Sequence, residues 1–143
     1  MANSVTNLEL FQITFPSVSK IINGNKFMFI DFKLNHMPLT FNSYGDIINY
    51  ADEYNLNYYV SNYIYSSKLL VDILEYIRQF DKNAVIFVQG DHGIHMLEDN
   101  HIKNYFNISM DEVYEIRNSV ISAYYIPDKY KNGNEKYLDN PLN

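Results

Sequence analysis

Apolar residues gather in short runs that turn-forming residues separate, and one run organises the rest of the chain. It reads Ala84-Val85-Ile86-Phe87-Val88, lies between Asp81-Lys82-Asn83 and Gly90, and is rich in β-branched and aromatic residues. This pattern predicts a short strand that is buried on both faces. Strands of that kind are typical of parallel sheets covered by helices.

Two further runs predict strands. Phe27-Met28-Phe29-Ile30-Asp31-Phe32 follows a turn at Asn23-Gly24-Asn25, and a third run, residues 120–126, is stopped by Pro127. Asp31 is the one charge within its run. It is therefore paired, placed at the functional edge of the sheet, or placed at an edge position that faces water.

Other stretches predict helices. Residues 58–80 carry apolar side chains every three or four positions and predict a long helix; these side chains are Tyr63, Leu70, Ile73, Leu74, Ile77 and Phe80. Residues 110–117 predict a short helix, with Ser109 as N-cap and Glu112 completing a capping box. Residues 1–24 predict a poorly defined helix or strand interrupted at Pro16, and residues 42–57 a loop with a short helix at 46–50. Helices that alternate with strands predict an α/β fold.

The candidate chemistry follows the first predicted strand, in Gly90-Asp91-His92-Gly93. Ligands of parallel α/β sheets bind beyond the carboxyl ends of the strands, where Asp91 and His92 would stand. A carboxylate and a neutral imidazole are good ligands for a divalent cation. We expect Gly90 to let the chain turn off the strand and Gly93 to let the backbone pass close to a bound group. The alternative is a polar turn that merely closes the strand.

Further candidates lie in two loops. His36, in Asn35-His36-Met37-Pro38, leaves the strand predicted at 27–32 by its carboxyl end, the end that Asp91 shares if the strands are parallel. It is either a site residue or an ordinary loop histidine. A second metal position built from His95 or His101 with Glu98 is also an interpretation, although no helical or hairpin spacing aims these side chains at one point.

Composition narrows the classes of function. The 143 residues are 47% hydrophobic and 20% charged, which predicts one folded domain over residues 1–143. The net charge of −6, with 11 scattered Lys and Arg, argues against nucleic-acid binding. A negative protein that handles anionic esters needs a metal or local dipoles to offset its own field.

Several features are absent from the sequence. There is no cysteine, which excludes a thiolate metal site and a cysteine nucleophile from this chain. No apolar run is long enough for a membrane span and no signal peptide follows Met1, so this chain is expected to be soluble. The pattern predicts no particular oligomeric state.

Spaced motifs carry a family resemblance. Asp91-His92-Gly93 after a strand, His36-Met37-Pro38 after an apolar run, the long helix before the strand, and residues 117–127 (RNSVISAYYIP) resemble the C-terminal half of the alkaline phosphatase superfamily. The resemblance is to its sulfatase and phospho-substituent transferase branch, and it runs from about Lys26 to the end of the chain. It implies an alkaline-phosphatase-like sheet covered by helices, of which this chain holds the C-terminal half.

The resemblance also implies roles. Asp91 and His92 match metal ligands, and His36 matches a histidine that contacts the oxygens of a phosphate or sulfate ester. Imidazole favours zinc or manganese over calcium or magnesium as the divalent metal ion. In this family the nucleophile and further acidic ligands come from an N-terminal half that has no match here. We therefore expect little or no hydrolysis or transfer by the isolated chain.

Two broader expectations remain. Relatives in this branch often carry N-terminal membrane anchors, so the parent protein is expected to place its catalytic domain outside the cytoplasm if it follows them. The alternative function is a non-catalytic α/β module, in which Asp91-His92 is a structural turn and the chain works by association with another polypeptide.

Overall fold

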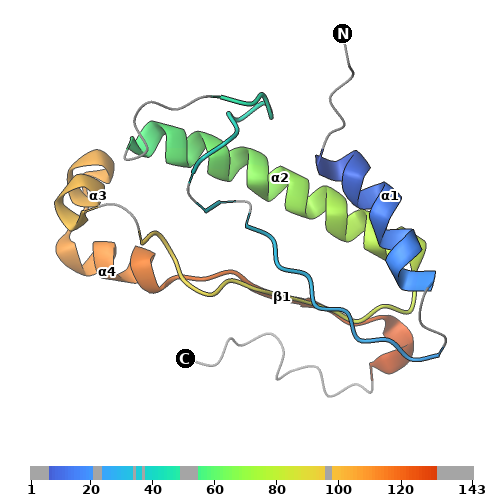
Figure 1. Ribbon diagram of the computed structural model, residues 1–143. Coiled ribbons are helices and arrows are strands. Elements are labelled where there is room, and N and C mark those ends of the chain that lie inside the picture. The colour runs from blue at the N-terminus through green and yellow to red at the C-terminus, as the bar shows by residue number, and fades with distance from the viewer. Residues whose placement is uncertain are drawn as a thin grey trace, which may run out of the picture. The chain divides into compact units, whose positions relative to one another are not determined.

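The computed structural model describes residues 7–20, 24–33, 35–36, 38–48, 55–95 and 98–131 (Figure 1). These residues fall into two compact units that divide between Asp81 and Lys82. Helices and a small sheet are both present, so the predicted mixture of α and β structure is confirmed. The single partial domain over residues 1–143 stays a prediction.

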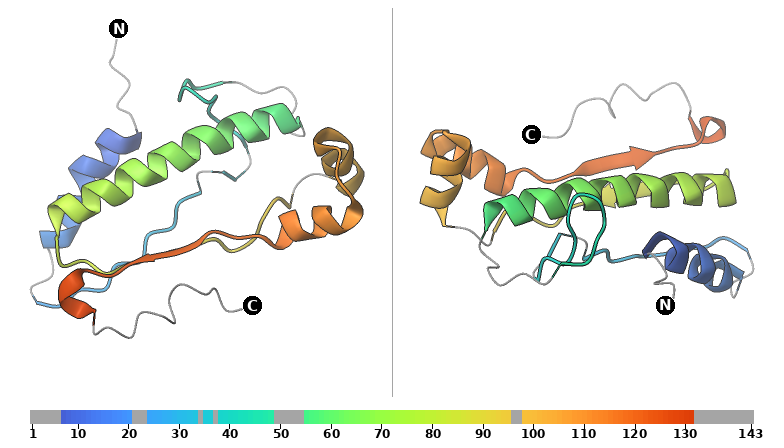
Figure 2. Two further views of the ribbon diagram at one scale, coloured as in Figure 1. Left: turned by 180° about the vertical axis from the view of Figure 1, so that it is seen from behind. Right: turned by 90° about the horizontal axis from the view of Figure 1, so that it is seen from above.

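The first unit contains α1 (Asn7–Lys20) and α2 (Leu56–Phe80). Both views of Figure 2 show α1 lying against the C-terminal half of α2. The second unit contains β1 (Ile86–Gln89), α3 (Asp99–Phe106), α4 (Met110–Asn118), β2 (Ser122–Tyr125) and a short 3₁₀ helix, η1 (Asp128–Tyr130).

The long helix predicted over residues 58–80 is confirmed as α2. It begins slightly earlier because the Asn55 side chain accepts a hydrogen bond from the Asn57 N–H at 2.9 Å and so caps the helix. The buried stripe is offset from the predicted one, since Asn62 and Ser66 are buried whereas Tyr63 is 55% exposed. Apolar spacing misses Asn62 and Ser66 because they are polar side chains buried with hydrogen-bond partners.

Helix α1 continues through Pro16, where the sequence predicted an interruption. Proline has no N–H, so the Gln12 carbonyl, one turn earlier, lacks its helical donor. The Tyr76 hydroxyl of α2 donates to that carbonyl at 3.1 Å. The Tyr76 ring also packs against Phe11 and Phe15, at centroid distances of 6.2 and 6.3 Å. A tertiary hydrogen bond within an aromatic cluster thus replaces the missing helical bond.

The strand predicted over residues 27–32 is wrong for this structure. Residues 26–33 are extended but are not assigned as a strand and pair with no described residue. Phe27 and Phe29 are 88% and 82% exposed, while Met28 and Ile30 are half-buried. Asp31 is exposed, as in the alternative that it faces water. An apolar run favours an extended backbone, whereas a strand also requires a hydrogen-bonded neighbour.

The short helix predicted at 46–50 is not present at residues 46–48, and residues 49–50 lie outside the described residues. Phe41 and Ile47 instead form an isolated antiparallel bridge. Gly45, between them, has a φ of +90°, a conformation that glycine adopts without strain. The segment is therefore a tight loop rather than a helical turn.

In the second unit, β1 and β2 form an antiparallel pair in which Phe87 lies opposite Tyr124 and Gln89 opposite Ser122. Both predicted strands are confirmed, but a parallel arrangement is wrong for this pair. Burial on both faces is also wrong within this unit, because Phe87 is 74% exposed. The chain returns through α3 and α4 to run back along β1, and an apolar run does not reveal the direction of its neighbour.

The capping box predicted at α4 is confirmed. The Ser109 hydroxyl accepts from the Glu112 N–H at 3.2 Å, and the Glu112 carboxylate accepts from the Ser109 N–H at 2.8 Å. The main-chain bond, followed by the bond from the Ser109 hydroxyl, lowers the pKa of Glu112 below its ordinary value. Helix α3 was not predicted. It is only eight residues long, and Ile102 is the one described residue of it that is buried, so no periodic apolar stripe marks it.

We predict that Tyr76→Phe lowers the free energy of unfolding by about 1 kcal/mol, because it leaves the Gln12 carbonyl without a donor. Pro16→Ala restores the helical N–H, so in that background the same substitution should cost less than about 0.5 kcal/mol. Urea unfolding of the four proteins measures both costs. Tyr63→Phe, on the exposed side of α2, is the control. Equal costs in the two backgrounds would contradict the role of Tyr76.

Candidate metal-binding turn

Asp91 and His92 stand directly after β1, on a turn that two main-chain hydrogen bonds close. The Gly90 N–H donates to the Ile121 carbonyl at 2.8 Å, and the Gly93 N–H donates to the Arg117 carbonyl at 3.0 Å. These bonds lie on either side of the Asp-His pair. The pair is therefore held against the segment that connects α4 to β2.

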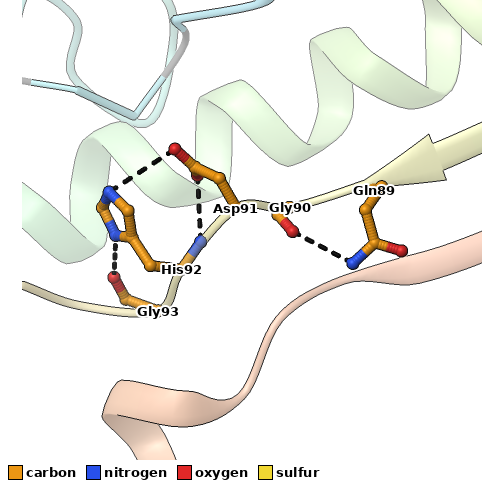
Figure 3. A network of polar contacts seen from close by, with 5 residues as sticks. All are labelled: Gln89, Gly90, Asp91, His92 and Gly93. Atoms are coloured by element: carbon orange, nitrogen blue, oxygen red, sulfur yellow. Dashed lines mark hydrogen bonds and ion pairs between the residues drawn. The ribbon is translucent and has the colours of Figure 1, made fainter. Parts of the chain in front are cut away.

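The His92 ring has a defined orientation (Figure 3). Its Nδ1 lies 2.8 Å from the Gly93 carbonyl oxygen. A carbonyl only accepts, so Nδ1 donates in this contact, and in a neutral ring Nε2 then carries the lone pair. Metal-binding histidines characteristically donate their other N–H to a carbonyl or carboxylate in this way.

The Asp91 carboxylate is oriented toward the same ring. Its Oδ1 accepts from the His92 N–H at 3.0 Å, and its Oδ2 lies 3.6 Å from His92 Nε2. That second distance is too long for a hydrogen bond. The side chains are 91% exposed for Asp91 and 54% exposed for His92. In the neutral ring the Nε2 lone pair therefore faces a carboxylate oxygen across a gap open to solvent, whereas in the protonated ring the same two atoms form an ion pair.

This gap suits one divalent ion. Two ligands at about 2.0–2.1 Å from a tetrahedral zinc ion lie about 3.3 Å apart, so a shift of a few tenths of an ångström would let both bind. Within the described ranges, no group of three or more His, Asp or Glu side chains could hold a metal ion. Asp91 and His92 could therefore fill at most two positions of a coordination sphere.

The two glycines of the turn differ from expectation. Gly90 was expected to let the chain turn, but it is not among the glycines with a positive φ, and a Cβ there would meet Ile121 and Val120 at an ordinary 3.4 Å. A Cβ on Gly93 would lie 2.6 Å from the Arg117 carbonyl oxygen and would also clash with the Ile116 carbonyl. Gly93 therefore permits a close approach, as predicted, but to the end of α4 rather than to a bound group.

The described contacts do not bring the side chains of the proposed second set of ligands, His95 or His101 with Glu98, together. The rings of His92 and His95 lie 5.5 Å apart at 55°. His101 is exposed on α3, and its main-chain N–H donates to the Glu98 carbonyl at 2.9 Å. As with Asp91 and His92, these residues belong to no three-ligand group in the described part of the chain, and the second metal position stays a prediction.

Arg117 supports the turn, and sequence reasoning assigned it no such role. Its guanidinium donates from Nη1 to the Ile94 carbonyl at 2.9 Å and from Nε to the Asp99 carboxylate at 2.5 Å. The side chain is 20% exposed. The sequence shows only that Arg117 is a basic residue in the last turn of a predicted helix. That feature is too common to identify its contact with the turn.

His36 lies in the first unit and is exposed. The loop around it is held by the buried side chain of Asn62, which accepts from the Phe41 N–H at 3.0 Å and donates to Asn35 Oδ1 at 2.9 Å. Burial and the neighbouring Tyr63 raise the pKa of Tyr59, and a hydrogen bond with the Asn35 side chain acts in the opposite direction. Asn62 thus fixes the chain on both sides of His36.

Comparisons of the chain with protein-family models, curated proteins and solved structures found no match. The resemblance to the alkaline phosphatase superfamily therefore stays a prediction. Among the described helices, none is both long and apolar enough to cross a membrane.

We predict that Gly93→Ala lowers the free energy of unfolding by about 1–3 kcal/mol, because its methyl group would overlap the main chain at the end of α4. Gly90→Ala is the matched control and should change it by less than about 0.5 kcal/mol. Denaturant unfolding of both variants measures the difference. Equal effects would show that the close approach at Gly93 does not constrain the turn.

We predict that Asn62→Ala destabilises the first unit by about 1–3 kcal/mol, because it removes the acceptor of the part-buried Phe41 N–H and a donor to the Asn35 side chain. Hydrogen exchange of the Phe41 amide should accelerate in this variant. Ser61→Ala removes the Ser61 hydroxyl that accepts from the Ser43 N–H, and it should accelerate exchange at Ser43 instead. Unchanged exchange at Phe41 in Asn62→Ala would contradict the anchoring role.

Proposed function

We propose that this chain is the C-terminal portion of a metal-dependent enzyme that acts on phosphate or sulfate esters. It would belong to the sulfatase and phospho-substituent transferase branch of the alkaline phosphatase superfamily, with an alkaline-phosphatase-like sheet completed by other sequence. Asp91 and His92 would supply two metal ligands. His36 would contact the oxygens of the ester.

The orientation of His92 carries the proposal. Here Nδ1 bonds to the Gly93 carbonyl, and Nε2 and Asp91 Oδ2 face each other at 3.6 Å. Both side chains remain largely exposed. When the ring is neutral, Nε2 and Oδ2 are two acceptors that face each other without a hydrogen bond, which is the arrangement that a shared cation would use.

The chemistry of the proposed reaction divides between the ion and the chain. A divalent ion would lower the pKa of a hydroxyl nucleophile and offset charge on the ester oxygens. The chain presents the Asp91 carboxylate and His92 Nε2 on one turn, and it offers the His36 imidazole as a donor to an oxyanion. The net charge of −6 makes a cation the economical means of holding an anionic ester.

One observation favours the second candidate, a module that works by association. Phe27 and Phe29 are 88% and 82% exposed on an extended stretch that pairs with no described residue. Exposed aromatic side chains beside unpaired backbone are features of a strand that another chain can cover. The two candidates are compatible if the covering chain carries the remaining catalytic groups.

The proposal predicts metal binding that depends on both ligands. Titration calorimetry with Zn²⁺ and Mn²⁺ should detect binding that Asp91→Ala and His92→Ala each weaken by about tenfold or more. His101→Ala, which removes an exposed histidine of α3, is the control and should leave the affinity unchanged. Binding that survives both substitutions, or that depends equally on His101, would contradict a site at Asp91 and His92.

A further inference from the structure

Arg117 contacts the Asp-His turn through its main chain and its side chain. Its carbonyl accepts from the Gly93 N–H at 3.0 Å, and its Nη1 donates to the Ile94 carbonyl at 2.9 Å. Its Nε pairs with the Asp99 carboxylate at 2.5 Å. Arg117 therefore binds the Gly93 N–H and the Ile94 carbonyl, the main-chain groups on either side of the Gly93 carbonyl.

The Gly93 carbonyl is the acceptor that orients His92. It belongs to the peptide group between Gly93 and Ile94, and its direction depends on the dihedral angles of these residues. Arg117 fixes the donor of Gly93 and the acceptor of Ile94, so it restricts rotation of this peptide group. The ion pair with Asp99 in turn restricts the Arg117 side chain, because a guanidinium holds two acceptors in fixed directions.

We propose that Arg117 is a positioning residue for the metal-binding pair. By anchoring both sides of the Gly93 carbonyl it keeps His92 in the Nδ1–H form, with Nε2 directed toward Asp91. This inference rests on the proposed function only in assigning metal binding to Asp91 and His92. The orientation of His92 itself is measurable without a metal. A purely structural pair between Arg117 and Asp99 would affect folding stability but not the protonated nitrogen of His92.

Two substitutions separate the contacts. Arg117→Met keeps much of the length of the side chain and removes all its donors. Arg117→Lys keeps the charge facing Asp99 but cannot reproduce the fixed fork that also reaches Ile94. Lys131→Met is the control, because it removes an exposed ion pair with Asp128 elsewhere in the same unit.

The first measurement is ¹⁵N nuclear magnetic resonance of His92 in the metal-free chain, at a pH where the ring is neutral. We expect the Nδ1–H form in the unsubstituted chain and in Lys131→Met. In Arg117→Met and Arg117→Lys the tautomer populations of His92 should shift toward the Nε2–H form, which is the form that neutral histidine prefers in water. The second measurement is Zn²⁺ affinity, which should fall about tenfold in Arg117→Met and remain unchanged in Lys131→Met.

The outcomes distinguish the positioning role of Arg117 from the metal site. If His92 keeps the Nδ1–H form in both Arg117 variants, the positioning role is overturned. If Arg117→Met does not fold, Arg117→Lys carries the test by the same criterion. If the ring responds to Arg117 but the unsubstituted chain binds no metal, the positioning role stands and the metal site fails.

Discussion

The hydrogen bond from the Gly93 N–H to the Arg117 carbonyl ties the candidate turn to the end of α4. It brings two segments of the main chain so near that a side chain at Gly93 would overlap the end of α4. It also joins the turn that follows β1 to the last turn of α4, shortly before β2. The Gly93 carbonyl that orients His92 belongs to the same closure. Fold and candidate site are therefore set by one approach of backbone to backbone.

Local signals in the sequence were sufficient for several elements. The periodic stretch and the capping box located α2 and α4, because helix formation and capping depend on residues within one or two turns. The apolar runs located β1 and β2. Their antiparallel direction and the exposure of Phe87 were not predicted, since both depend on where the chain returns. For the same reason, residues 26–33 gave an extended backbone without a paired strand.

The candidate site shows a similar division. The position of Asp91 and His92 beyond a strand was predictable from the run that precedes them. The supports of the site were not, because Arg117 and Asn62 act through hydrogen bonds to segments distant in sequence. Pro16 is a related case, since the Tyr76 hydroxyl that permits it lies on another helix. Polar side chains that hold main-chain groups are the class of residue that patterns of hydrophobicity cannot identify.

The exposure of Asp91 and His92 has a consequence for the kinetics of ion exchange. Both donors are in contact with water, so an ion could reach them without opening the fold and could keep most of its own hydration shell. Arrival and departure would then be limited by the loss of individual water molecules rather than by protein motion. The imidazole would favour zinc or manganese, and two ligands alone would add little further selectivity. Selectivity would be decided by whichever groups later replace the remaining water.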